Sequence, residues 1–356
     1  MKDPQCAWAL LLHSAVPRAN YTLRTVPPTL SKEYAAAHDK AVWECFCAIT
    51  GAGDWSGDAT AREVASLSGT HGGLGLRSAT RTAPAAYWAS WADALPVLAG
   101  KSNALASLAL TRLDDAGRTP PVCLAEAEAA RTFLSNEGAQ NLPTWREAAL
   151  GAKPPKPAQD EEETFDRGWQ RHASAAVDRR FKENEILPKL SPASRALLHS
   201  QSCPDGSSFL RALPSERGYC LRPLRFLTAL RRRLRWRIPL AGGQCKGASC
   251  QADLDPLGDH AAACCRSGLL KLRARPVEKV WARVLREAGC TVREHFCMRD
   301  AGLPSVSAND QRHLEVVASG LAYQRGVPLA VDATVVSPLK ACGNHAQERT
   351  SGQDSP

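Results

Sequence analysis

The chain has 356 residues, of which 44% are hydrophobic and 23% charged, and its formal net charge is +9. This composition is ordinary for a folded protein, so it excludes a wholly disordered chain, and the length leaves room for more than one domain. No apolar run approaches the roughly 18–20 residues that span a bilayer, which excludes a membrane protein. The excess of Lys and Arg favours a polyanionic partner.

The cysteines indicate a reducing compartment. There are 13 of them at irregular spacing, whereas disulfide frameworks are typical of short secreted chains with an even number. The apolar run from Cys6 to Val16 lacks a basic segment before it and contains His13, so we interpret it as a buried helix and not as a signal peptide. We therefore expect an intracellular protein, nuclear or cytoplasmic, whose thiols pack in the core or bind metal.

The first two thirds of the chain are predicted to be mainly helical. In residues 1–150 apolar residues recur three and four positions apart, and Pro27-Pro28 separates the first two elements. Residues 151–163 are rich in Pro and charge and form a predicted linker. A second helical region follows at 164–240. The helices expected in the first region are Tyr34–Ile49, Ala83–Leu98, Ala104–Leu113 and Cys123–Leu134.

A basic segment at 222–237 contains seven arginines and no acid. Apolar residues fall between the arginines at helical spacing, which predicts an amphipathic helix with a basic face. Because guanidinium groups bind phosphate in a bidentate manner, this face favours DNA or RNA as the partner over a merely solvated surface. The predicted contacts are Arg222, Arg225, Arg231, Arg232, Arg233, Arg235 and Arg237.

A metal-binding pattern follows at 241–268. Cys245, Cys250, His260 and Cys264 have the spacing Cys-x4-Cys-x9-His-x3-Cys. Two short-range pairs of sulfur and nitrogen ligands suit one tetrahedral zinc ion, and with four protein ligands the zinc would be structural. Cys265 competes with Cys264 as the fourth ligand, and scattered thiols with a surface His remain the alternative.

The last part of the chain, 269–341, changes from helix to strand. Pro276 to Gly289 is predicted to be a helix, with an apolar stripe facing the core. Three β-like runs follow, and they are Cys290–Met298, Leu314–Val317 and Pro328–Val336. The polar residues 342–356 are expected to be a disordered tail.

Two acids lie on neighbouring predicted strands, Glu315 and Asp332. One carboxylate on each of two adjacent strands can hold Mg²⁺, which activates water and neutralises charge on a scissile phosphate. Nuclease cores of this kind usually carry a lysine two residues after the second acid, where this chain has Thr334. On spacing alone, two acids on strands are most often edge or surface residues.

These motifs together resemble the C-terminal part of non-LTR (LINE-type) retrotransposon reverse transcriptase polyproteins. The segment from His71 to Ser78, His-Gly-Gly-Leu-Gly-Leu-Arg-Ser, is similar to the one that follows their polymerase palm. The knuckle with Gly258-Asp259-His260 is similar to their Cys-Cys-His-Cys knuckle, and 312–339 is similar to their restriction-like endonuclease.

The resemblance implies an order of thumb-like helices, linker, basic segment, knuckle and endonuclease. The family's Arg/Lys-Pro-Asp motif corresponds to Arg312–Glu315, with Glu in place of Asp, and its second acid corresponds to Asp332. We expect a truncated endonuclease domain, and no reverse transcriptase activity from this chain alone because the palm would precede it.

The expected fold class is therefore α+β, a helical region followed by a zinc knuckle and a small αβββ domain of the restriction-endonuclease type (partial PD-(D/E)xK). Three functions compete. The first is a nucleic-acid-binding part of a retrotransposon polyprotein with structural zinc. The second is a stand-alone Mg²⁺-dependent DNA endonuclease that uses Glu315 and Asp332. The third is a non-catalytic helical scaffold.

Overall fold

The computed structural model describes residues 3–53, 57–114, 121–155, 168–203, 205–238, 242–247, 250–301, 306–307, 309–321, 327–333 and 335–339. The chain divides into two compact units, Met1–Pro239 and Leu240–Pro356. Most of the expected linker and the expected disordered tail lie outside the described residues. Within the residues described, no helix has both the length and the apolar character that a membrane crossing requires.

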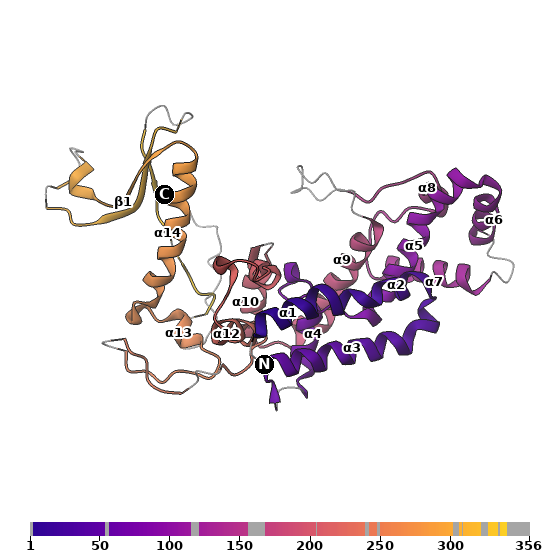
Figure 1. The fold of residues 1–356 in the computed structure, drawn as a ribbon, viewed down its shortest axis with the longest axis horizontal. Coiled ribbons are helices and arrows are strands. Elements are labelled where there is room, and N and C mark those ends of the chain that lie inside the picture. Colours follow the sequence, from indigo (N-terminus) through magenta and orange to yellow (C-terminus); the bar gives the residue numbers. More distant parts are fainter. Residues whose placement is uncertain are drawn as a thin grey trace, which may run out of the picture. The chain divides into compact units, whose positions relative to one another are not determined.

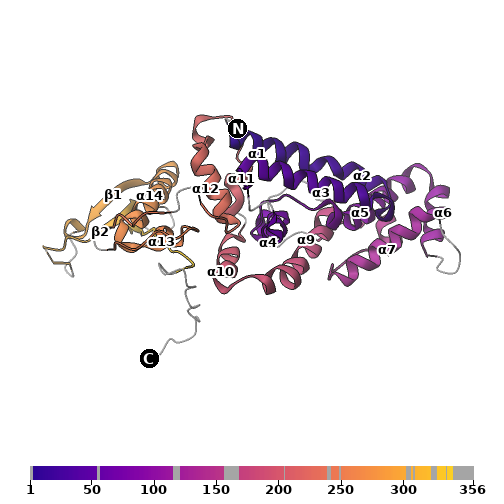
Figure 2. The same cartoon turned by 90° about the horizontal axis from the view of Figure 1, so that it is seen from below.

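Helices and short helical turns build the first unit (Figure 1, Figure 2). The expected helices are present, most of them extended by a few residues, and Pro27 breaks the chain between α2 and α3 as predicted. The helices are α1 Pro4–Leu10, α2 Ala19–Thr25, α3 Pro28–Thr50, α4 Ala59–Ser66, α5 Ala79–Lys101, α6 Asn103–Asp114, α7 Val122–Asn136, α8 Trp145–Ala149, α9 Trp169–Phe181, α10 Pro192–Gln201, α11 Ser208–Arg211 and α12 Pro223–Arg233.

Three apolar clusters lie in the described part of the first unit, and two of them are large. In one, α5 packs against α7, α8 and α9, and Trp88 and Trp169 meet edge to face. This cluster joins residues on both sides of the expected linker, so the helices before and after 151–163 share a core. The other cluster contains Trp8, Phe46 and Trp236 from α1, α3 and the residues after α12. The basic segment is thus an integral part of the helical core.

The glycine-rich turn at 72–75 belongs to this core too. Leu74 and Leu76 are buried. A Cβ atom at Gly73 would lie 2.2 Å from the backbone oxygen of Leu67, so the chain passes there too closely for any side chain. The turn is a packing element of the first unit.

A helix and a three-stranded antiparallel sheet form the second unit. After the short α13, Asp259–Ala263, come α14, Leu269–Glu287, and the strands β1, Thr291–Cys297, β2, His313–Ser319, and β3, Leu329–Val331. The strand order is β1-β2-β3. The β2–β3 pairing places Val316 opposite Val331. Ala282 and Leu285 of α14 pack on Val316 and Ala318 of the sheet.

The orientation of α14 differs from the prediction. The helix begins at Leu269 and continues through Pro276. Four members of its expected core-facing stripe are exposed, with exposed fractions of 42% for Val277, 52% for Val280, 46% for Trp281 and 43% for Val284. The buried stripe is instead narrow and combines two alanines with one acid and one leucine. It consists of Ala274, Glu278, Ala282 and Leu285.

Candidate metal centre and basic segment

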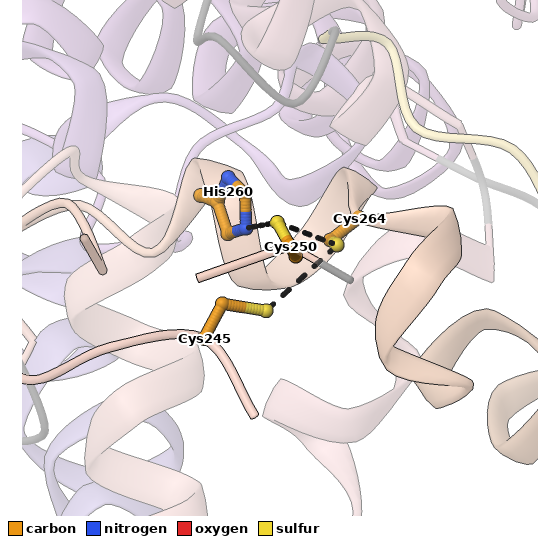
Figure 3. A group of neighbouring side chains, drawn as sticks. All are labelled: Cys245, Cys250, His260 and Cys264. Atoms are coloured by element: carbon orange, nitrogen blue, oxygen red, sulfur yellow. Dashed lines mark hydrogen bonds between the residues drawn. The ribbon is translucent and has the colours of Figure 1, made fainter. Parts of the chain in front are cut away.

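The four expected zinc ligands lie together in the second unit (Figure 3). One ligand atom from each of Cys245, Cys250, His260 and Cys264 lies within 4.8 Å of every other. The Sγ atom of Cys264 lies 3.8 Å from that of Cys245 and 3.7 Å from that of Cys250. The Nε2 atom of His260 lies 3.4 Å from the Cys250 Sγ. The sequence prediction of this ligand set is confirmed as a spatial cluster.

These separations match the edges of a zinc tetrahedron. With Zn–S bonds of about 2.3 Å, tetrahedral geometry separates two sulfur atoms by about 3.8 Å. The two measured S···S distances agree with this value, and the slightly shorter S···N distance suits the shorter Zn–N bond. Three thiols and one imidazole are also the ligand types of structural zinc sites, so the residues fit this ion.

A short hairpin positions the first two ligands. The amide of Cys245 donates to the carbonyl oxygen of Ala252 at 2.8 Å, and the amide of Cys250 donates to that of Gly247 at 2.9 Å. A Cβ atom at Gly247 would lie 2.9 Å from the backbone oxygen of Arg266, so only glycine fits this approach. The hairpin is therefore packed against the chain just after Cys264.

The short helix α13 positions the other two ligands, and two charged side chains hold its ends. The carboxylate of Asp255 accepts hydrogen bonds from the amides of Asp259 at 3.0 Å and His260 at 2.7 Å. The guanidinium of Arg273 donates to the carbonyl oxygen of Ala262 at 2.8 Å. Neither residue was expected from the sequence, because Asp255 lies three residues before the N-cap position, Gly258, where capping side chains are normally found.

The surroundings of Cys264 favour its thiolate. Burial raises the pKa of the Cys264 thiol, but hydrogen bonds from the backbone at Arg266 and Ser267 and from the neighbouring thiols outweigh burial and lower this pKa to about 7. A lowered pKa helps metal binding because the thiolate is the ligand. The competing ligand, Cys265, is exposed and outside the cluster.

The structure divides the seven arginines of the basic segment into different roles. Arg233 is buried, and its guanidinium donates to the carbonyl oxygens of Gly73, Gly206, Gly69 and Gln201 at 2.6–3.3 Å. Burial lowers the pKa of Arg233 to about 10. A side chain so enclosed holds the glycine-rich turn in place and does not face a phosphate.

Arg231 also bonds to the backbone of the first unit. Its guanidinium donates to the carbonyl oxygens of Thr50 at 2.7 Å and Gly51 at 2.9 Å, at the C-terminal end of α3. Arg222, Arg225 and Arg237 are exposed, whereas Arg232 and Arg235 are half-buried. The helix α12 is present as predicted, but its arginines do not form one uniform basic face.

The two predicted catalytic acids come from neighbouring strands of the sheet. Glu315 is on β2, and Asp332 directly follows β3. Burial raises the pKa of Glu315, and the negative charges of Glu278 and Asp332 raise it further. Glu278, from the buried stripe of α14, is a third acid whose charge acts on Glu315. Among the described residues, only the Cys and His set brings three or more ligand atoms together closely enough to hold an ion.

No protein-family model and no curated protein matches this chain.

Proposed function

We propose that the chain is a nucleic-acid-binding part of a non-LTR retrotransposon polyprotein, with a structural zinc ion in its second unit. The observation that carries the proposal is the tetrahedral arrangement of Cys245, Cys250, His260 and Cys264. Zinc would be held by all four residues and would stiffen a hairpin and helix whose residues lie outside the apolar cluster of the second unit.

Two further features support a nucleic-acid partner. The net charge of +9 favours a polyanion, and Arg222, Arg225 and Arg237 are exposed in the basic segment. The order α14-β1-β2-β3, with an acid on β2 and another just after β3, is also the order expected of the restriction-like domain in this family.

Nucleic-acid binding by the zinc-containing chain and by two cysteine variants tests the proposal. The full chain, purified with its zinc, should bind a short fluorescein-labelled duplex DNA or single-stranded RNA with an affinity that falls as salt rises. The variant Cys264→Ser should lose zinc and bind more weakly. Cys265→Ser is the matched control, because Cys265 is adjacent but exposed, and it should behave as the wild type. Equal zinc content and affinity in both variants would contradict the proposal.

The family assignment has a separate test. Full-length sequencing of the transcript should show an in-frame Tyr/Phe-x-Asp-Asp palm upstream of this coding region. Stop codons on both sides of the frame would argue against a functioning polyprotein, while leaving zinc and nucleic-acid binding to be judged by the experiment above.

A second candidate function is Mg²⁺-dependent cleavage of DNA by Glu315 and Asp332. It is favoured by the grouping of Glu315 with Glu278 and Asp332. Burial first, and then the charges of these two acids, raise the pKa of Glu315, and a bound cation would neutralise the repulsion among the carboxylates. The acids would bind the ion, and the ion would activate water. Under this hypothesis Asp332→Ala abolishes Mg²⁺-dependent nicking of supercoiled plasmid and leaves binding intact. Nicking that persists in this variant would exclude the hypothesis.

A further inference from the structure

A row of basic side chains runs along α14. Lys271, Arg275, Lys279 and Arg283 follow one another at intervals of four residues and are all exposed. Residues four apart lie one above another on the same side of a helix, about 6 Å apart along its axis. The four side chains therefore form a continuous basic ridge, the α14 ridge, about 18 Å long.

Few acidic side chains neutralise the positive charge of the α14 ridge. Arg283 forms an exposed ion pair with Glu287 at 3.5 Å. In the part of the chain that the structure describes, Lys271, Arg275 and Lys279 take part in no ion pair or hydrogen bond of their side chains. The other acid of the helix, Glu278, lies in the buried stripe. Among the described residues, these three side chains therefore have no ion-paired or hydrogen-bonded acid, and only Lys279 acts through its charge on a nearby acid, Glu294 of β1.

The spacing of the ridge is unfavourable for the isolated helix. Like charges four residues apart repel each other, and this repulsion destabilises a helix. Alternating acids and bases at the same positions would have stabilised the same exposed face. A row of cations is instead suited to a ligand with a row of anions, as in the phosphate backbone of a nucleic acid.

The ridge starts next to the metal centre. Arg273 of α14 donates to the carbonyl oxygen of Ala262, one residue from the end of α13 and close to the ligand Cys264. Both elements belong to the second unit. A zinc-ordered knuckle would therefore hold the first turn of α14 in a fixed position relative to the four ligands.

We propose that the α14 ridge is a phosphate-backbone contact of the second unit, distinct from the arginines of the basic segment. This inference rests on the proposed nucleic-acid binding and adds to it the surface that makes the contact. The ridge would position the nucleic acid without reading its sequence, because cations on phosphates carry no base information. The apolar stripe of α14 has no role in the proposal.

The test compares the salt dependence of binding by the full, zinc-containing chain. The triple variant Lys271→Gln, Arg275→Gln, Lys279→Gln keeps residues of similar helix propensity. If the three cations contact phosphates, the slope of log affinity against log salt for a short labelled duplex DNA should become shallower by roughly 2–3. The charge-preserving variant Lys271→Arg, Lys279→Arg should keep the wild-type slope, which separates lost charge from altered folding.

A second triple variant controls for net charge. Lys32→Gln, Arg293→Gln and Arg299→Gln remove an equal number of charges from exposed positions outside the ridge, one of which pairs with an acid. This control should change the slope by less than about 1. An equal change in both triple variants, or none in the ridge variant while the wild type binds, would overturn the ridge proposal alone. Absence of binding by the wild type would overturn the proposed function together with it.

Discussion

The carboxylate of Asp255 accepts a hydrogen bond from the backbone amide of His260 at 2.7 Å. An acid outside the ligand set thus holds the start of the helix that supplies two of the four candidate zinc ligands. The same carboxylate also accepts from the amides of Leu257 and Asp259. The shape of the metal centre therefore depends on a cap as well as on its thiols and imidazole.

Removing this cap should weaken zinc binding. We predict that Asp255→Ala lowers zinc affinity by roughly tenfold to a hundredfold, as expected when a group that orients a ligand is lost. Competition with a chromophoric chelator measures the change. Asp253→Ala is the control, because Asp253 is exposed and only its backbone pairs with Gln244. Equal affinities in the two variants would show that the cap does not organise the site.

A second prediction concerns Arg233. Arg233→Met leaves up to four carbonyl oxygens without their cationic donor, and we expect a loss of about 3 kcal/mol or more in the unfolding free energy of the first unit. Urea denaturation followed by tryptophan fluorescence measures it. Arg225→Met, on the exposed side of the same helix, should change stability by less than about 0.5 kcal/mol. A similar small change for Arg233→Met would contradict the structural role.

A third prediction uses the pKa of Glu315, which Glu278 helps to raise. A carboxyl group whose pKa is raised on folding binds its proton more tightly in the folded state. The folded state is therefore favoured at low pH, and this contribution is lost as pH rises through the folded pKa. Glu278→Gln removes part of the repulsion, so its stability relative to the wild type should increase as pH rises above about 4.5.

Hydrogen exchange of the β2 amides, compared between variants at the same pH, measures this difference. Glu287→Gln provides the control, since Glu287 is on the exposed side of α14 and pairs with Arg283. A difference between Glu278→Gln and the wild type that is independent of pH would mean that Glu278 does not act on Glu315 through its charge.

The fourth prediction follows from the exposed arginines of the basic segment. Replacing Arg222, Arg225 and Arg237 with Gln should flatten the salt dependence of nucleic-acid binding without lowering the stability of the first unit. Binding titrations at several salt concentrations measure the salt dependence, and urea denaturation measures the stability of the first unit. An unchanged slope of log affinity against log salt would show that the exposed arginines of the basic segment do not contact the nucleic acid.

Local signals were sufficient to predict much of the fold. Helices such as α3 and α7 repeat apolar residues along one side for three or more turns, and proline or glycine marks several of their ends. The strands β1 and β2 begin and end close to their predicted limits. The cluster of candidate zinc ligands was also predictable, because metal geometry restricts both the residue types and the spacing.

Tertiary contacts explain where the prediction failed. A run of arginines does not reveal that Arg233 meets four backbone carbonyls from segments distant in sequence. In α14, large apolar residues and small ones occupy adjacent stripes, and Ala282 and Leu285 are the ones that pack on the sheet. Glu278 lies on the same buried stripe. Which side chains become buried depends on the element against which a helix packs. The spacing of apolar residues along the helix contains no information about that element.

The metal content of the protein tests the central claim most directly. Native mass spectrometry of the full chain, purified without added metal, should show about one zinc ion per chain, and Cys250→Ser should show less than the wild type. Wild-type protein that carries no zinc and takes up none when it is offered would contradict the assignment of Cys245, Cys250, His260 and Cys264 as a zinc site.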